Sequence, residues 1–180
     1  RLMERDEGGT FERLKAHRKS FVEPLLAEHR GRIVKLMGDG ALCEFASVVD
    51  AVACAVAIQR GMAEREAGVA EADCTRFRIG VNLGDLVVDE DGDLYGDGVN
   101  VAARLEQLCD PGGVFVSGTA HDHLRGKLRD ELEYLGERQL KGIERPVRVY
   151  RAVTSGVIVP PAPPLPDRPS IAVLPFDNMS

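Results

Sequence analysis

The chain has 180 residues, of which 44% are hydrophobic and 29% charged, and its formal net charge is -6. This composition predicts one soluble globular domain of ordinary size with a short additional piece. The negative charge argues against nonspecific nucleic-acid binding, which needs a basic surface, and no apolar run reaches the roughly 20 residues of a membrane span.

The cysteines are scattered along the chain and form no CxxC pair. Each lies in or beside an apolar segment, which is typical of a small buried side chain. We therefore expect reduced structural thiols and a cytoplasmic protein. The four residues are Cys43, Cys54, Cys74 and Cys109.

The first predicted element is a helix over residues 10–29, whose apolar residues recur at helical spacing. We expect Pro24 to bend or restart this helix and Gly31 to stop it. Two β-prone runs follow within residues 32–45. The Gly38-Asp39-Gly40 segment between them predicts a hairpin.

The first strand of this hairpin has a mixed character. If its side chains alternate regularly, Ile33, Lys35 and Met37 lie on one face. Val34 and Leu36 then lie on the other. A face that combines a lysine with apolar neighbours suits an interface better than open water.

A second helix is predicted to begin at Ser47, because Asp50 three residues later completes a start that resembles a capping box. Gly68 lies just past its expected end. Residues 76–89 then have the pattern of a long strand interrupted by two glycines.

The run DLYGDGVNVAARLE, residues 93–106, joins an acidic turn to a helix with two different faces. Asn100 and Arg104 are four residues apart and share one face, whereas Leu105 and Leu108 belong to an apolar stripe. An amide beside a guanidinium suits a nucleotide site, although such a pair alone is more often part of a solvated helix face. The acidic turn does not match a calcium-binding EF-hand loop in either register tested.

The remaining pattern predicts a strand over residues 114–117 and a short helix over residues 119–127. A closing pair of strands is expected around residues 132–140 and 147–153. Strands and helices therefore interleave, and an α+β or α/β domain with a mixed sheet follows.

The last part of the chain changes character. Residues 154–169 contain six prolines and hardly any charge, which predicts a semi-rigid linker. Residues 170–180 open with the strand-like run IAVLPF followed by Asp177. We expect these residues to begin a further, truncated domain. The alternative is that the tail strand fills a vacant place in the sheet of the main domain.

The motifs KLMGDG, DLYG and NVAAR, in this order and spacing, together resemble the class III nucleotide cyclase catalytic domain. The resemblance covers residues 1–153. It implies an α+β, ferredoxin-like cyclase fold with a mixed, mostly antiparallel sheet and helices packed on one face. It also implies that the first strand is missing from this chain. The residues that carry the resemblance are Lys35, Asp39, Asp93, Asn100 and Arg104.

The resemblance implies roles in binding the substrate. Lys35 is similar to a lysine that donates to an adenine ring nitrogen, and Asp93 to the acceptor for the adenine amino group. Related guanylate cyclases place different side chains at these two positions, so ATP is favoured over GTP. Lys141 resembles a contact for the terminal phosphates. Each of these residues, taken alone, is more often an ordinary surface charge.

The resemblance also implies the chemistry. Asn100 would orient the ribose, Arg104 would stabilise charge on the transferring phosphoryl group, and Asp39 would be the second of two aspartates that hold two Mg²⁺ or Mn²⁺ ions. On its own, an aspartate in such a glycine-flanked turn is more often turn chemistry. The ribose 3′-hydroxyl would attack the α-phosphorus and pyrophosphate would leave. No side chain stands out as the general base.

Homodimers with shared sites are a further implication, with Asp39 from one subunit and the other residues from its partner. The family's other metal-binding aspartate lies on a first strand, expected upstream of Arg1. We therefore predict an adenylate cyclase for intracellular signal transduction, with little or no activity in this fragment. The alternative is a noncatalytic cyclase-homology module for dimerisation and nucleotide binding. A diguanylate cyclase is disfavoured because the GGDEF signature is absent.

Overall fold

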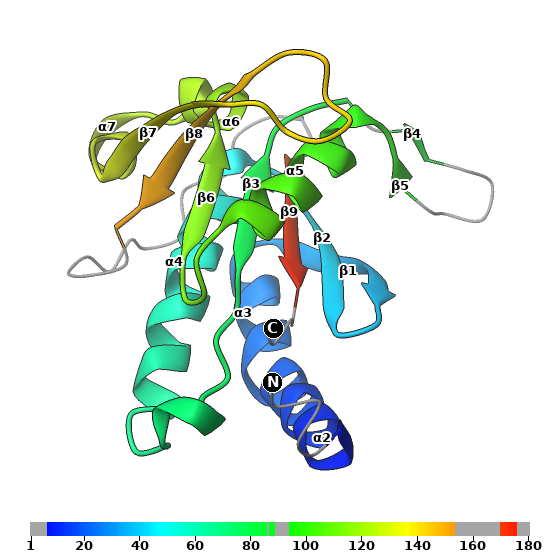
Figure 1. Cartoon of the computed structure of the whole chain (residues 1–180), viewed down its shortest axis with the longest axis vertical. Coiled ribbons are helices and arrows are strands. Elements are labelled where there is room, and N and C mark those ends of the chain that lie inside the picture. Colours follow the sequence, from blue (N-terminus) through cyan, green and yellow to red (C-terminus); the bar gives the residue numbers. More distant parts are fainter. Residues whose placement is uncertain (1–6, 86, 89–93, 154–169, 176–180) are drawn as a thin grey trace.

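The computed structural model describes residues 7–85, 87–88, 94–153 and 170–175 (Figure 1). Its strands are β1 (Gly31–Met37), β2 (Gly40–Phe45), β3 (Ile79–Asn82), β4 (Val87–Val88), β5 (Leu94–Tyr95), β6 (Val114–Ser117), β7 (Leu132–Arg138), β8 (Val147–Ala152) and β9 (Ser170–Pro175). Seven strands form one sheet in the order β1-β2-β9-β3-β6-β8-β7, and β4 pairs with β5. Within the seven-stranded sheet only the β3–β6 pair is parallel. The predicted α+β class and mostly antiparallel sheet are confirmed.

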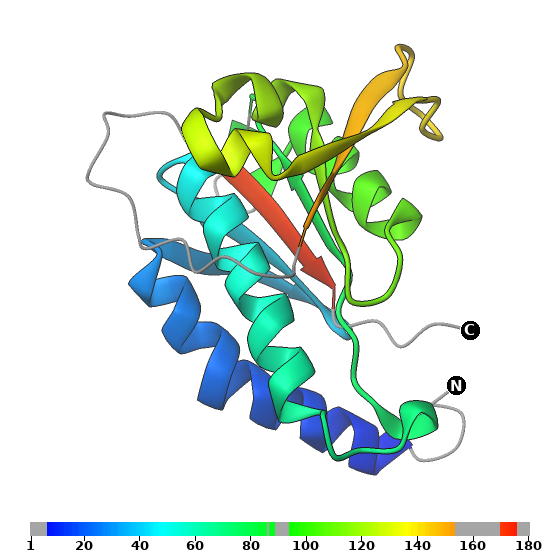
Figure 2. The ribbon, with the colours of Figure 1, turned by 90° about the vertical axis from the view of Figure 1, so that its left-hand side faces the viewer.

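Helices cover both faces of this sheet (Figure 2). They are α2 (Glu7–His17), the π-helix η1 (Arg18–Val22), α3 (Glu23–Glu28), α4 (Val48–Arg65), the 3₁₀ helix η2 (Glu71–Asp73), α5 (Asp97–Leu108), α6 (Gly118–His123) and α7 (Gly126–Asp130). On β2, Cys43 belongs to the core under α4, whereas the adjacent Leu42 packs with Ala102 of α5. Because successive strand residues face opposite sides, α4 and α5 lie on opposite faces. The expectation of helices on one face is wrong for α5.

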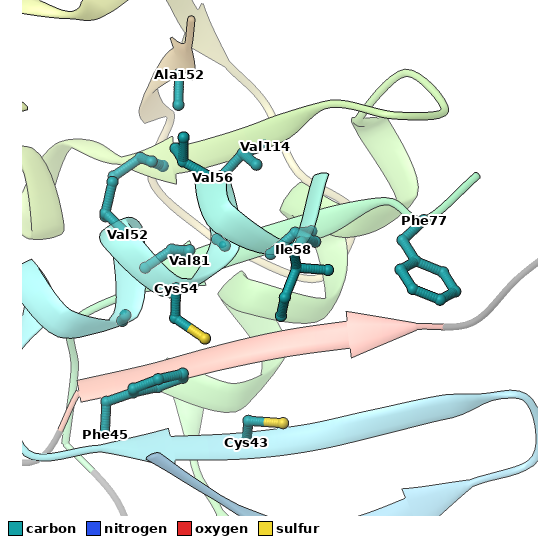
Figure 3. Packing of buried hydrophobic residues seen from close by; sticks show 14 of the residues in the cluster. Cys43, Phe45, Val52, Cys54, Val56, Ile58, Phe77, Val81, Val114 and Ala152 are labelled. Atoms are coloured by element: carbon teal, nitrogen blue, oxygen red, sulfur yellow. The ribbon is translucent and has the colours of Figure 1, made fainter. Parts of the chain in front are cut away.

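The larger core lies between α4 and the sheet (Figure 3). Ile58 of α4 and Val81 of β3 are fully buried there, as are the thiols of Cys43 and Cys54. Burial raises the pKa of the Cys43 thiol to about 12. All four cysteines are free, and three of them are buried, which confirms the predicted structural thiols.

The predicted first helix is present but broken. Its π-helical stretch, η1, ends just before Pro24, which lies in the first turn of α3, so the expected restart is confirmed. The helix stop differs from the prediction, because Arg30, with φ 58°, takes the left-handed conformation. Gly31 is needed for another reason: a Cβ there would lie 2.4 Å from the ring of Phe45.

The start of α4 confirms the predicted cap. The Ser47 hydroxyl accepts a hydrogen bond from the Asp50 amide at 3.2 Å and donates to its carboxylate at 2.8 Å. Arg30 also forks onto this carboxylate, at 2.8 Å between Nη2 and Oδ1. Asp50 is 1% exposed. These contacts satisfy a buried charge and connect the start of the hairpin to α4.

Elements in the second half of the chain agree in part with the prediction. The strand over 114–117 and the closing pair β7 and β8 are confirmed. The long strand expected over 76–89 is confined in the described residues to β3 and β4. The single helix expected over 119–127 is instead two helices, because the chain is extended at Leu124 and Gly126 has a φ of 58°.

The tail strand lies in the middle of the sheet. β9, drawn in red in Figure 1, runs between β2 and β3 and is antiparallel to both. The alternative that the tail fills a place in this sheet is therefore confirmed. Residues 154–169 lie outside the described part of the chain. No helix within the described residues is long and apolar enough to cross a membrane.

Candidate active site

A β-bulge in β1 decides where Lys35 lies. Ile33 is paired with Cys43, but the next pair joins Lys35 to Leu42, so Val34 is an extra residue on its strand. Directly opposed residues share a face of the sheet. Lys35 therefore lies on the face of Leu42, which α5 covers, while Ile33 packs into the core under α4. The expectation that Ile33 and Lys35 share a face is wrong, because it assumed unbroken alternation.

The predicted metal ligand Asp39 is in the two-residue turn between β1 and β2. Gly38, its neighbour in the turn, has a φ of 62°, a conformation that glycine adopts without strain. Asp39 is half-buried. Leu36 and Met37 just before the turn are 46% and 43% exposed. This end of the hairpin thus presents apolar surface beside a carboxylate, as an interface would.

Helix α5 lies unusually close to the sheet. A Cβ on Gly80 of β3 would be 2.2 Å from the carbonyl oxygen of Ala102 and 2.6 Å from the amide nitrogen of Glu106. At the other end of the helix, a Cβ on Gly98 would be 3.1 Å from the carbonyl oxygen of Asp85. Only glycine permits such close approach of two backbones. The position of α5 is therefore fixed closely by the backbone itself.

A buried polar chain attaches the first turn of α5 to the core. Asn82, at the end of β3 and 4% exposed, donates from Nδ2 to the carbonyl of Gly98 at 2.9 Å. Its Oδ1 accepts from the hydroxyl of Thr119 at 3.0 Å, and that hydroxyl is 2.8 Å from the hydroxyl of Ser117. The sequence motifs did not identify Asn82 as a functional residue. The feature that could have indicated it is a single polar side chain at the end of an otherwise apolar strand.

An ion pair holds the opposite end of α5. Arg78 Nε lies 3.8 Å from Glu106 Oε1, and both side chains are at most 10% exposed. Arg78 also donates to the carbonyl of Gln107 at 3.5 Å. Because both charges are buried away from water, removing either side chain would leave the other charge uncompensated and would lower stability. Both ends of the helix that carries Asn100 and Arg104 are thus anchored.

The structure brings Arg104 and the Lys141 segment together. Arg104 Nε donates to the backbone carbonyl of Lys141 at 3.1 Å, and Nη1 donates to Oε1 of Gln107 at 2.7 Å. Lys141 lies in the turn between β7 and β8, and its side chain is exposed. Asn100, one helical turn before Arg104, is exposed as well. Asp93, the predicted base acceptor, lies outside the described residues.

The described residues do not by themselves form a two-metal centre. Within them, no group of three or more histidine, cysteine, aspartate or glutamate side chains is placed to hold an ion. Mg²⁺ keeps several water ligands and is commonly held by one or two carboxylates together with substrate phosphates. Asp39 can supply one such carboxylate at an accessible turn. A second ion would need donors from beyond the described residues.

The chain is similar to known cyclases over most of its length. A model of the adenylate and guanylate cyclase catalytic domain matches residues 4–153. A protein of Rhizobium meliloti (strain 1021) named "Putative adenylate cyclase 3" is 49% identical over 187 residues, covering 100% of this chain. The chain spans 32% of that relative's length.

Solved structures agree with this match. An adenylate/guanylate cyclase/hydrolase from Silicibacter pomeroyi is 37% identical, with a TM-score of 0.77 over 84% of this chain and 89% of that chain. A Trypanosoma brucei adenylate cyclase, 24% identical with a TM-score of 0.69 over 85% of this chain and 82% of that chain, supports the fold. The chain therefore belongs to the adenylate and guanylate cyclase catalytic domain family.

Proposed function

We propose that this domain is an adenylate cyclase, which converts ATP to 3′,5′-cyclic AMP and pyrophosphate for signal transduction in the cytoplasm. The name of the 49% identical relative supports the choice of ATP. The observation that carries the proposal is the bulge at Val34. With the bulge, Lys35 lies on the sheet face that α5 covers, which supports the proposal that Lys35 contacts the base on the same side of the molecule as α5.

The residues of this side fit the steps of the reaction. The Asn100 amide can hydrogen-bond a ribose hydroxyl and hold the 3′-oxygen toward the α-phosphorus. The guanidinium of Arg104 can fork onto phosphate oxygens and stabilise the charge that builds on them. Two of its donors bond to the Lys141 carbonyl, in the β7–β8 turn, and to Gln107 of the same helix, so the guanidinium lies near that turn. Lys141 then supplies a charge for the terminal phosphates.

Metal ions belong to the proposal as well. Mg²⁺ or Mn²⁺, two per site in the intact domain, would neutralise the triphosphate and favour ionisation of the attacking hydroxyl. Asp39 is the ligand proposed from the described residues. We expect that adding a chelator abolishes activity and that Asp39→Ala raises the Mn²⁺ concentration needed for half-maximal rate. Asp130→Ala, an exposed aspartate outside the proposed site, is the matched control.

A homodimer with shared sites is the proposed active form. Asp39 would come from one subunit, and Asn100 and Arg104 from its partner. Mixing Asp39→Ala protein with Asn100→Ala protein should then restore part of the activity, because one mixed dimer contains one intact site. If both variants dimerise and the mixture stays inactive, the shared-site proposal is wrong.

The substrate preference is tested by the products. Purified chain, and a version extended upstream of Arg1, are incubated with ATP or GTP and Mn²⁺, and cyclic AMP and cyclic GMP are quantified. We expect cyclic AMP as the main product and more activity in the extended version. Lys35→Ala should reduce discrimination between the two nucleotides, whereas Lys19→Ala, at an exposed position of η1, should not.

A noncatalytic module is the second candidate, and one observation favours it: the described residues gather no group of three or more histidine, cysteine, aspartate or glutamate side chains that could hold an ion. Such a module would bind nucleotide and dimerise without turnover. Calorimetric binding of ATP by a folded extended version that forms no cyclic nucleotide, with either metal, would select this candidate over the enzyme.

A further inference from the structure

The turn between β7 and β8 that contains Lys141 has a defined backbone conformation. The amide of Ile143 donates to the carbonyl of Leu140 at 3.1 Å, so residues 140–143 form a hydrogen-bonded β-turn. Gly142, the third residue of this turn, has a φ of 80°. Among the described residues Arg30 is the only non-glycine with a positive φ, so the φ of Lys141 is negative. This combination defines a type II turn.

Both ends of this turn are held in place by side chains. Leu140 is buried in the apolar cluster that contains Leu105 of α5, and Ile143 packs against the same cluster. The side-chain amide of Gln139 also donates to the carbonyl of Ile143. Because the ends of the turn are fixed, the turn type decides the orientation of its middle peptide group.

The middle peptide group, between Lys141 and Gly142, provides an acceptor for Arg104. The carbonyl of Lys141 accepts the Nε–H of Arg104 at 3.1 Å. In a type I turn this peptide group is rotated by roughly half a turn relative to type II, which would direct the carbonyl away from Arg104. Type II requires a positive φ at the third residue, a conformation that glycine adopts without strain. Gly142 therefore secures the direction of the Lys141 carbonyl.

Gln107 provides a second acceptor for the same guanidinium. It follows Arg104 by three residues on α5, and its Oε1 accepts from Nη1 of Arg104 at 2.7 Å. The guanidinium is planar and its donors are in a fixed fork. Two acceptors on two different nitrogens therefore fix both its position and the rotation of its plane. Among the described residues none accepts from Nη2, which leaves the donors of this nitrogen for a phosphate oxygen.

We propose that Gly142 and Gln107 are positioning residues, which together hold the guanidinium of Arg104 where it meets the transferring phosphoryl group. Gly142 acts through the direction of the Lys141 carbonyl, and Gln107 acts through its own side-chain oxygen. This inference rests on the proposed cyclase function. A guanidinium that is already held needs no reorganisation when charge builds on the phosphate, and a preorganised donor of this kind contributes most to catalysis.

Substitutions of Gly142 can change the turn type without a steric clash. A Cβ on Gly142 would have nothing within 4 Å, so only its positive φ opposes a side chain. Valine rarely adopts such a φ, whereas asparagine does. In the extended version, Gly142→Val should lower kcat by about 10- to 100-fold and change the KM for ATP by less than about three-fold. Gly142→Asn should recover most of this loss. Gly126→Val is the matched control, because Gly126 has a φ of 58° and equally open surroundings, and its kcat should stay within about two-fold.

A second background shows whether these effects pass through Arg104. Gln107→Met removes the acceptor but keeps the length of the side chain, and should lower kcat by about five- to ten-fold. In an Arg104→Ala background, Gln107→Met and Gly142→Val should each change kcat by less than about two-fold, because no guanidinium is left to position. A loss that persists in this background, equal kcat of Gly142→Val and Gly142→Asn, or a loss that appears in KM alone would each overturn the proposal.

Hydrogen exchange tests the holding of the guanidinium without turnover. In the unchanged chain the Nε–H of Arg104, assigned by the loss of its NMR signal in Arg104→Lys, should exchange with water at least about ten-fold more slowly than the Nε–H of exposed Arg76. Gly142→Val should remove this difference, and Gly142→Asn should keep it. Equal exchange of the two arginines in the unchanged chain would overturn the proposal. Slow exchange in an extended version that forms no cyclic nucleotide would support the holding and overturn the proposed function, so the two failures are distinguished.

Discussion

The two faces of the sheet are built in different ways. Under α4, side chains make the contact: Phe45, Ile58 and Val81 interlock in one apolar cluster, at most 2% exposed. Under α5, backbones make it, because Gly80 lets the helix approach so closely that no side chain would fit at that position. The α5 face also holds smaller apolar clusters, and the bulge in β1 puts Lys35 on this face.

We infer from this difference that the α4 face mainly determines the stability of the domain and the α5 face mainly determines its activity. Side-chain packing gains free energy from the area it removes from water, and it tolerates changes of shape only at a cost in stability. A helix held by glycine contacts, a buried amide and an ion pair gains less from burial but has a closely defined position. We expect substitutions on the α4 face to change folding, and substitutions on the α5 face to change turnover.

The largest expected effect is on the α4 face. Ile58→Ala should lower the free energy of unfolding by about 2–5 kcal/mol, because Ile58 is fully buried and its removal leaves a cavity. Denaturant titration gives this value, and Ile58→Val should lose only about 0.5–1.5 kcal/mol. Turnover per folded molecule in the extended version should stay within two-fold. A large loss of turnover at unchanged folded fraction would remove the distinction between the faces.

On the α5 face, Arg104→Ala should lower kcat by about 100- to 1000-fold, as removal of a single stabilising donor does in other enzymes. Its stability should change by less than about 1 kcal/mol, because the bonds that its guanidinium makes to described residues go to the Lys141 carbonyl and to Gln107 of its own helix. Arg104→Lys keeps the charge but not the fork and should recover little. Exposed Arg76→Ala is the control, and activity of Arg104→Ala near that of the control would exclude the assigned role.

Asn82 is buried in the core and also attaches the first turn of α5, so its replacement should change both stability and turnover. Asn82→Ala leaves the Gly98 carbonyl and the Thr119 hydroxyl without their partner and should cost about 1–3 kcal/mol of stability. It should also lower kcat more than it changes KM, because the first turn of α5 loses its attachment. A double-mutant cycle with Thr119→Val measures the coupling. Additive effects of the two substitutions would show that the polar chain does not act as a unit.

The smallest expected effect is a dependence of stability on pH. Burial lowers the pKa of His29, against the opposing charges of Glu28 and Asp50 and with a contribution from Arg30. The unfolded state then binds a proton more readily than the folded state, so stability is full above the ordinary histidine pKa, near 6.5, and falls as the pH drops below it. The slope for one proton is at most about 1.4 kcal/mol per pH unit.

His29→Asn should flatten the decline in stability between pH 6.5 and 5, measured by denaturant titration at each pH. His123→Asn, at an exposed position, serves as the matched control and should leave the decline unchanged. An identical decline in the His29 variant would assign the pH dependence to other groups.

Local patterns in the sequence predicted local structure well. The strand over 114–117 is a continuous apolar run, and Ser47 and Asp50 form their cap within one turn, so neither depends on distant contacts. The helix stop predicted at Gly31 was wrong, because the role of Gly31 depends on a contact that is distant in the sequence. The left-handed residue is Arg30, and Gly31 is needed instead to make room for the ring of Phe45 on the neighbouring strand.

The candidate site was predictable as a set of residues but not as an arrangement. The spacing of Asn100 and Arg104 is fixed by the helix, whereas the contact of Arg104 with Lys141 joins segments 37 residues apart. Asn82 carried no motif, because its role depends on the approach of Gly98. The place of β9 could be stated only as an alternative, since the sequence does not reveal which strands lack a partner.

The extra residue at Val34 has a consequence for comparing relatives of this chain. Removing one residue from β1 would restore regular alternation and turn Lys35 to the opposite face, although every motif residue would remain in the sequence. Two relatives with identical motif letters can therefore differ in the face of the sheet on which their lysine lies. Counting residues between Ile33 and the turn, and not matching letters alone, is what would distinguish them.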